Sequence, residues 1–325
     1  MKGGLLMYRY RKFIHILIFA FIVAVVGFNT KYNPFIQNEA VEWSQSVEDV
    51  AKTEDALYKE IEQKESEYIE RPQDAVIDKV WKKTPGRNGR NVDVAKSYEQ
   101  MKKKGTFDES LLVFEQTPPE VTFKDLPASP VYRGHPEKEM VALLINVSWG
   151  TEHIPDILNT LKEHNSKATF FIEGKWAKEN ADLVKMIDEQ GHTIGNHAYN
   201  HPNMARLSSQ QITEQITKTN TIIEAIIDKT PKWFAPPSGS FTDKVVDNAD
   251  HLNMETILWT VDTIDWKNPS VSVMMNRVMT KIHPGATILM HPTASVVEGL
   301  SPMIEDIEKK GYKIGTIDQL LNEER

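Results

Sequence analysis

Two histidines at four-residue spacing are the first residues in this sequence that suggest chemistry. His197 and His201 lie in the segment GNHAYNHP at 195–202. Two imidazoles this close in sequence can reach one metal ion, and a carboxylate as third ligand would leave a zinc ion with an open position for water. The same spacing also suits two ordinary histidines on one turn, and the pair alone does not decide between these interpretations. Because the chain has no cysteine, any metal must be held by histidines and carboxylates.

The histidine pair falls within a region where short apolar segments alternate with amphipathic helices. The segments expected to form strands are 141–147, 168–172, 192–196, 233–235, 256–259, 287–290 and 312–314. The expected helices are 154–163, 181–190, 209–228, 244–251, 271–282 and 301–310. Repeated strand-helix units predict a parallel sheet or barrel of the α/β class, and in a βα barrel the chemistry gathers at the carboxyl ends of the strands.

Residues from about 138 to 322 resemble the polysaccharide deacetylase (NodB-homology) family of carbohydrate esterases. The matching segments are GNHAYNHPNM at 195–204, APPSG at 235–239, DTIDW at 262–266 and LMH at 289–291. The resemblance implies a distorted (β/α) barrel that removes N-acetyl groups from peptidoglycan or chitin-like glycans with a divalent metal, zinc or cobalt. It also implies that His197 and His201 bind the metal, that His291 donates a proton to the leaving amine, and that Asp262 and Asp265 support His291.

The first family motif, Thr-Phe-Asp-Asp-Gly, is altered in this chain. In the family its first Asp is the general base and its second Asp is a metal ligand. Counting back from the matching proline in the next helix places Asn146 at the base position and Val147 at the ligand position. Aligning on Gly150 instead places Ser148 and Trp149 there. Neither alignment restores an Asp, and an amide has no useful basicity near neutral pH.

Two further positions bear on the missing base. Ala235 stands where the family has the Arg that orients the base, and losing that Arg is expected once the base has gone, since a buried Arg without a partner is costly. Glu152 lies six residues beyond Asn146, on the loop to the next helix, and is expected at the same end of the barrel. It is a candidate metal ligand or substitute base. The alternative is that Glu152 only favours the N-terminus of the helix that begins near 154.

The function indicated is therefore a polysaccharide deacetylase, a hydrolase of carbon-nitrogen amide bonds, weakened because the base and the Asp ligand are replaced. The alternative is a catalytically inactive member that binds an N-acetylated glycan. A third interpretation is a membrane-tethered structural protein that acts through residues 41–126.

The composition indicates a folded, acidic protein. The chain has 325 residues, of which 40% are hydrophobic and 26% charged, and its net charge is -8. Such a composition excludes a wholly disordered or fibrous protein. An acidic chain without a concentrated basic stripe is a poor nucleic-acid binder, so no nucleic-acid partner is expected.

The N-terminal residues 1–30 read as a signal anchor or a signal peptide. Four basic residues, Lys2, Arg9, Arg11 and Lys12, precede the apolar run at 13–28. No clear cleavage site follows that run, which favours a retained membrane anchor. The basic residues then place the rest of the chain outside the cytoplasm, at the cell membrane, or secreted if the segment is cleaved.

The remainder is expected to form three parts. Residues 31–71 are rich in Glu and Lys and predict a charged stalk, 72–136 predict a small α+β accessory module with a linker, and 137–325 predict the deacetylase-like domain. The anchor, the stalk and the Asn-Val-Ser-Trp-Gly variant at 146–150 resemble the sporulation-associated branch of firmicute deacetylases.

The expected orientation is testable on intact cells. Protease added from outside should digest the chain beyond Asn29, because the basic cluster holds the N-terminus inside. Immunoblotting of the C-terminal domain before and after digestion measures this. An intact, fully protected protein in the cytosolic fraction would refute the anchor.

Overall fold

The structure is a computed structural model and describes residues 55–325. The expected membrane segment and most of the expected stalk lie outside the described residues. Within residues 55–325, no helix is both long enough and apolar enough to cross a membrane. The contacts divide the described residues into a smaller unit, 55–69 with 92–115, and a barrel unit, 70–91 with 116–325. These boundaries differ from the expected ones at 71 and 136, because residues 72–91 and 116–136 fold with the barrel.

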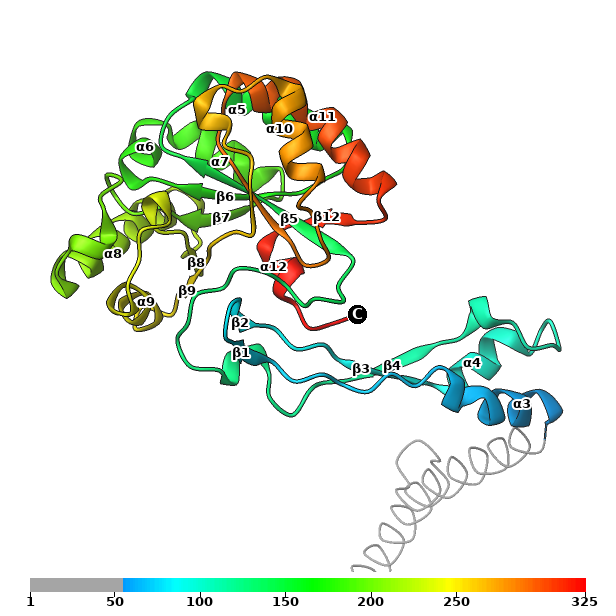
Figure 1. Cartoon of the computed structure of the whole chain (residues 1–325). Coiled ribbons are helices and arrows are strands. Elements are labelled where there is room, and N and C mark those ends of the chain that lie inside the picture. Colours follow the sequence, from blue (N-terminus) through cyan, green and yellow to red (C-terminus); the bar gives the residue numbers. More distant parts are fainter. Residues whose placement is uncertain (1–54) are drawn as a thin grey trace, which may run out of the picture. The chain divides into compact units, whose positions relative to one another are not determined.

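The barrel unit is built on a curled parallel sheet (Figure 1). Its strands, in order across the sheet, are β10 (Val261–Asp262), β11 (Thr287–Met290), β5 (Met140–Val147), β6 (Thr169–Ile172), β7 (Thr193–Asn196), β8 (Trp233–Phe234) and β9 (Glu255–Thr256). A further strand, β12 (Lys313–Gly315), pairs in parallel with the first residues of β5. The expected parallel sheet of the α/β class is confirmed.

Helices follow the strands along the chain, as expected. They are α5 (Ile154–Glu163), α6 (Gly174–Glu179), α7 (Ala181–Glu189), α8 (Ser209–Ile227), α9 (Asp243–Asp250), α10 (Val271–Met279), α11 (Ala294–Lys309) and α12 (Ile317–Leu321). α8 begins at a capping box, in which the Ser208 hydroxyl accepts from the Gln211 amide and the Gln211 side chain accepts from the Ser208 amide. Such local signals explain why the starts of α5, α7, α8, α9 and α10 were predictable to within one residue. In contrast, α11 begins at residue 294 rather than 301, and α6 and α12 were not expected.

Alternation along β5 separates two hydrophobic cores. Its odd-numbered residues, 141–147, pack in the cluster formed with the helices. The even-numbered Ala142 and Leu144 pack in a second cluster with Phe171 and Ala235. Because successive side chains of a strand point to opposite faces, Asn146 continues the second row at the carboxyl end of β5.

An antiparallel hairpin of β1 (Val76–Asp78) and β2 (Lys82–Thr84) also belongs to the barrel unit. Lys83 in β2 is buried, and its Nζ lies 2.6 Å from Oε1 of Glu255 in β9 and 4.5 Å from the ring centre of Phe123. Burial raises the pKa of Glu255, and the Lys83 ammonium opposes that rise. The hairpin is thus fixed to the barrel by the ammonium group of Lys83, whose burial is tolerated because Glu255 pairs with it.

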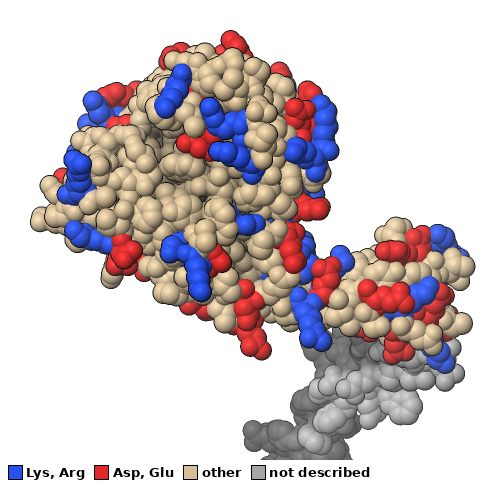
Figure 2. Space-filling view, viewed as in Figure 1, with Lys and Arg blue, Asp and Glu red and all other residues tan. Residues whose placement is uncertain are grey.

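The smaller unit holds α3 (Ala56–Lys64) and α4 (Val94–Met101), around a core of Leu57, Ile61, Val92 and Met101. Two strands, β3 (Gly89–Val92) and β4 (Phe114–Thr117), form a two-stranded sheet. On the face of the barrel unit that Figure 2 shows, basic and acidic side chains are interspersed.

Candidate functional site

A pocket of about 340 Å³ opens at the carboxyl ends of the strands of the barrel unit. The residues that line it are Asn146, Ser148, Trp149, His197, His201, Ser238, Trp259, Asp262, Trp266, Leu289 and His291. They come from the ends of β5, β10 and β11 and from the loops that follow β5, β7, β8, β9, β10 and β11. The structure therefore brings together the two predicted metal histidines, the predicted acid His291, Asp262 and the position of the missing base.

Asn146 occupies the base position as an uncharged, unsatisfied group. Its side chain lines the pocket at 3% exposure, and its Oδ1 has no hydrogen-bond partner within the part of the chain that the structure describes. Ala235, at the position of the family Arg, is buried beside Ala142 and Leu144 and offers only a methyl group. Base and orienting cation are both absent, so no described residue at this point can take a proton from water as a carboxylate would.

The neighbouring position, Val147, faces the other way. Val147 is fully buried in the core against the helices and does not line the pocket, whereas Ser148 does. Glu173 directly follows β6, and its backbone N–H donates to the Val147 carbonyl at 2.9 Å. Burial raises the pKa of the Glu173 carboxyl, and the Ser148 hydroxyl opposes the rise. Sequence reasoning missed Glu173, although an acid directly after the buried strand segment ATFFI was a visible signal.

The loop that carries the histidine pair is held by Asn196, the last residue of β7. Its Oδ1 accepts from the Ala198 amide at 2.8 Å, and its Nδ2 donates to a carbonyl of α8 at 2.9 Å. Ala198 and His201 adopt left-handed backbone angles, with φ of 60° and 55°. Non-glycine residues adopt that region rarely, so the contacts around the loop must enforce it.

Both histidines are held in the neutral form. The Nδ1 of His197 lies 2.7 Å from the Ala235 carbonyl oxygen and must donate to it, which leaves Nε2 with a free lone pair. Burial lowers the pKa of His197 to about 3, and partial burial lowers the pKa of His201. The two ring centroids are 5.2 Å apart. Neutral imidazoles whose second nitrogen is anchored are the form that binds metals.

The third ligand for a metal is missing. Nowhere in residues 55–325 do three or more His, Asp or Glu side chains converge as a metal site requires. A catalytic zinc takes three protein ligands and leaves one position to water. His197 and His201 could supply two of these, and the apolar Val147 could supply none. The residues present therefore do not fit the complete ligand set that the family resemblance implies.

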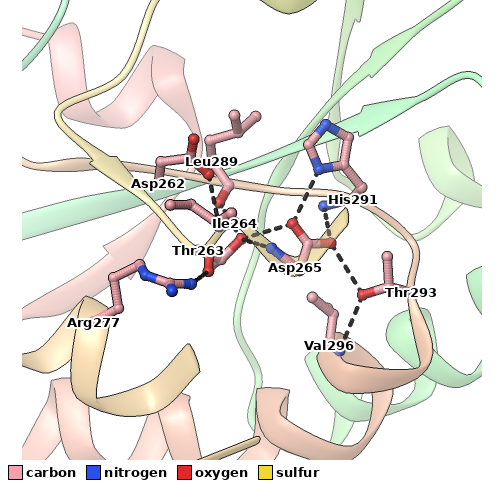
Figure 3. Close-up of polar contacts among 9 residues, drawn as sticks. All are labelled: Asp262, Thr263, Ile264, Asp265, Arg277, Leu289, His291, Thr293 and Val296. Carbon is pink, nitrogen blue, oxygen red and sulfur yellow. Dashed lines mark hydrogen bonds and ion pairs between the residues drawn. The ribbon is translucent and has the colours of Figure 1, made fainter. Parts of the chain in front are cut away.

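Figure 3 shows the polar network beneath His291. Asp265 is fully buried and accepts hydrogen bonds from Nδ1 and the backbone N–H of His291, each at 3.0 Å. The hydroxyls of Thr263 and Thr293 donate to the same carboxylate at 2.7 and 3.0 Å. Burial raises the pKa of Asp265, but these hydrogen bonds outweigh burial and hold it below its ordinary value. The ionised Asp265 thus fixes the ring of His291 and leaves its Nε2 available to a ligand.

Two exposed indoles border the pocket. Trp149 is stacked on the His291 ring, with centroids 6.0 Å apart and an interplanar angle of 9°, and Trp266 is half exposed. Gly150 has φ of 75°, and a Cβ there would lie 2.1 Å from the Pro292 carbonyl oxygen. That close approach holds the turn after Trp149, so the indole stays beside His291.

Glu152 does not join this group, which corrects its assignment as candidate ligand and substitute base. Its side chain is 73% exposed, and its Oε1 lies 3.7 Å from Nε2 of His153. After Gly150 the chain turns into the 3₁₀ segment Thr151–His153, which leads into α5. That turn carries Glu152 to the surface at the start of α5, where its charge favours the helix N-terminus.

The pocket has groups suited to one part of an amide hydrolysis and lacks those needed for another. The ring of His291 is held in one orientation by Asp265, and polar and aromatic groups surround a space that an acetamido sugar could fill. A positioned base and a complete metal ligand set are both lacking within the described residues. Activation of a water molecule is the step that this pocket does not provide.

The fold and these residues define a member of the polysaccharide deacetylase family, to which the chain belongs. The polysaccharide deacetylase family model matches residues 133–257. A peptidoglycan-N-acetylglucosamine deacetylase of Bacillus cereus is 35% identical over 58% of this chain and 70% of its own length. The protein YlxY of Bacillus subtilis is 47% identical over 97% of this chain and 99% of its own length. Members of this family are hydrolases of N-acetyl amide bonds.

A solved structure shows the same fold in a protein described as lacking catalysis. BA3943 of Bacillus anthracis, described as a CE4 family pseudoenzyme, is 54% identical, with a TM-score of 0.79, over 83% of this chain and 96% of its own. A variant of BA3943, 53% identical to this chain with the same TM-score, is described as having restored enzymatic activity; it matches 83% of this chain and 99% of the variant's own. The expected family and the expected parallel-sheet fold of the α/β class are thus confirmed.

The incomplete ligand set predicts the behaviour of a Val147→Asp variant. In buffer that contains a metal chelator, the free energy of unfolding of this variant should be about 2–3 kcal/mol lower than that of the wild type, because the new carboxylate is buried without a partner. Zinc should restore little of that loss and should bind the variant no more tightly than the wild type, because a carboxylate at 147 points to the helices and away from His197 and His201. Urea unfolding with and without zinc, and calorimetric titration, measure both effects.

Val147→Asn is the matched control, since it places a polar group of the same shape in the core but is a poor zinc ligand. It should lose stability in both buffers. Zinc that stabilises Val147→Asp but not Val147→Asn would show that this carboxylate reaches His197 and His201, and it would contradict the placement of Val147 in the core.

Proposed function

We propose that this chain binds an N-acetylated cell-wall glycan in the pocket and hydrolyses its amide slowly or not at all. The observation that carries the proposal is Asn146, whose buried Oδ1 faces the pocket without a partner at the position of the family base. A buried acceptor without a partner costs stability unless a ligand satisfies it. The N–H of an acetamido group is a donor of the required kind.

The remaining pocket supports binding more than turnover. Trp149 and Trp266 offer exposed indole faces on which a sugar ring can pack, as aromatic side chains do in many binding sites. Asp262 is the one acidic side chain among the described residues that line the pocket. The loss of a positioned base typically lowers a rate by 10²- to 10⁴-fold.

The relatives support the same proposal. The ligand class follows from the peptidoglycan deacetylase of Bacillus cereus, and the slow or absent hydrolysis follows from the pseudoenzyme BA3943. The restored activity of a BA3943 variant supports the view that the sugar-binding part of such a site survives the loss of its base. A divalent ion, zinc or cobalt, would bind weakly to the two histidines.

We further propose a location for this activity. The basic and apolar residues 1–30 would hold the chain at the cell membrane, with residues 31–325 outside the cytoplasm, or would direct secretion if they are cleaved. A role in sporulation rests on the resemblance of the segment at 146–150 to the sporulation-associated branch.

Binding is tested with N-acetylglucosamine tetrasaccharide and with its fully deacetylated counterpart. The acetylated probe should bind, and Trp149→Ala should weaken that binding about tenfold, because the sugar loses an indole face. Trp81→Ala is the matched control, since Trp81 is exposed but lies outside the residues that line the pocket. Calorimetry measures all three proteins. No binding of the acetylated probe, or equal weakening by both variants, would contradict the proposal.

Hydrolysis is tested by restoring the base. Wild-type acetate release should be low or undetectable, and Asn146→Asp should raise it 10²- to 10⁴-fold, because this change returns a carboxylate to the pocket. Asn146→Asp with Ala235→Arg should exceed the sum of its single variants, because the Arg acts only on a carboxylate.

Glu152→Gln should leave wild-type behaviour unchanged, because Glu152 is at the surface. Rapid acetate release by the wild type that Glu152→Gln abolishes would overturn both this proposal and the placement of Glu152.

A further inference from the structure

The hairpin of β1 and β2 carries several exposed apolar side chains, none of which lines the pocket. Four large apolar residues lie within the six positions 76–81. They are Val76, Ile77, Val80 and Trp81, which are 49, 43, 67 and 37% exposed. Within residues 55–325, five other large apolar side chains reach such exposure, and two of these, Trp149 and Trp266, border the pocket. A concentration of this kind usually marks an interaction surface.

The turn that presents these side chains is held in place. Oδ1 of Asp78 accepts from the backbone N–H groups of Val80 and Trp81, each at 2.7 Å. The Trp81 ring centre lies 5.8 Å from the guanidinium of Arg133 and 6.3 Å from the ring centre of His283. The apolar residues of the turn are therefore displayed by a fixed scaffold.

The base of the hairpin is equally fixed to the barrel. The Lys83 backbone N–H donates to the Pro130 carbonyl at 3.1 Å, and Lys82 forms a β-bridge with Val131. The buried pair of Lys83 and Glu255 completes the attachment. Because the hairpin is already fixed to the barrel, its tip needs no further ordering when it binds a partner.

The tip carries positive charge beside its apolar residues. Lys79 and Lys82 are exposed and flank Val80 and Trp81. The one carboxylate of the turn, Asp78, is occupied by the backbone hydrogen bonds from Trp81 and Val80, which lower its pKa, and Arg133 faces it. Lys79, Lys82 and Arg133 thus lie around one carboxylate that is already hydrogen-bonded within the turn.

We propose that this hairpin tip, residues 76–82, inserts its apolar side chains into the interface of a bilayer that contains anionic lipid. Valine and isoleucine side chains gain from the acyl boundary, tryptophan favours the interface, and lysines are attracted by anionic headgroups. A neutral glycan would leave the cations without an anionic partner, and an acidic peptide would leave Val76 and Val80 exposed to water. The apolar segment at 13–28, expected to hold the chain at a membrane, would raise the local concentration of the tip at that surface.

The test uses the full chain and its lack of cysteine. A single Val80→Cys substitution gives a unique site for an environment-sensitive fluorophore. Vesicles of phosphatidylcholine with phosphatidylglycerol should shift the label's emission to shorter wavelength, and vesicles of phosphatidylcholine alone should shift it far less. Val273→Cys is the matched control, since Val273 is 49% exposed on α10, and its label should keep an aqueous spectrum.

Two further substitutions test the role of charge. In the Val80→Cys background, Lys79→Gln with Lys82→Gln should weaken partitioning of the tip to anionic vesicles by roughly 25-fold, about fivefold for each lysine. Both lysines are exposed, so the urea unfolding curve should stay unchanged. An aqueous spectrum at position 80 in anionic vesicles, or equal shifts at positions 80 and 273, overturns the proposal. A shift that appears without vesicles and grows with protein concentration, together with a dimer in sedimentation, also overturns it in favour of a second copy of the chain.

Discussion

The site depends on the alternation of side chains along β5. This central strand pairs with β11 on one edge and with β6 and β12 on the other, so its register is tied to three neighbours. Because every second residue points the same way, Asn146 and Ser148 must face the pocket while Val147 must face the helices. The chemistry of the site is therefore decided by which residue types stand at a few fixed positions. A neutral amide at 146 removes the base without disturbing the packing of the strand.

The parts of the structure that were predictable are those with local signals. Apolar runs, helix caps and the family motifs identified the alternating strands and helices, the histidine pair and His291. The attachment of the β1–β2 hairpin was not predictable, because it depends on Lys83 meeting Glu255, 172 positions away. Nothing near Lys83 in the sequence signals that contact. The surface position of Glu152 also required the structure, since the left-handed turn at Gly150 decides where the next residues point.

Binding and catalysis place different demands on such a pocket. Binding needs shape, apolar faces and a few satisfied polar contacts, all of which are distributed over many residues. Catalysis needs groups that act in the transition state, and each is a single residue at a single position. Replacement of Asp by Asn at position 146 therefore changes the second property far more than the first. The two histidines have no third ligand beside them among the described residues, so the same separation is expected between holding the loop and binding a metal.

The residues that this chain retains from the family motifs include some with a second, structural task. Asp265 accepts four hydrogen bonds, three of which join the loop after β10 to the loop after β11, and a buried donor left without it would cost about 1–3 kcal/mol. His197 likewise ties the loop after β7 to the Ala235 carbonyl. The family's base, its orienting Arg and its Asp ligand are replaced here by Asn146, Ala235 and Val147, none of whose side chains carries such a link in this structure. Retention of Asp265 and His197 is therefore what folding alone would require, and it does not by itself indicate an active enzyme.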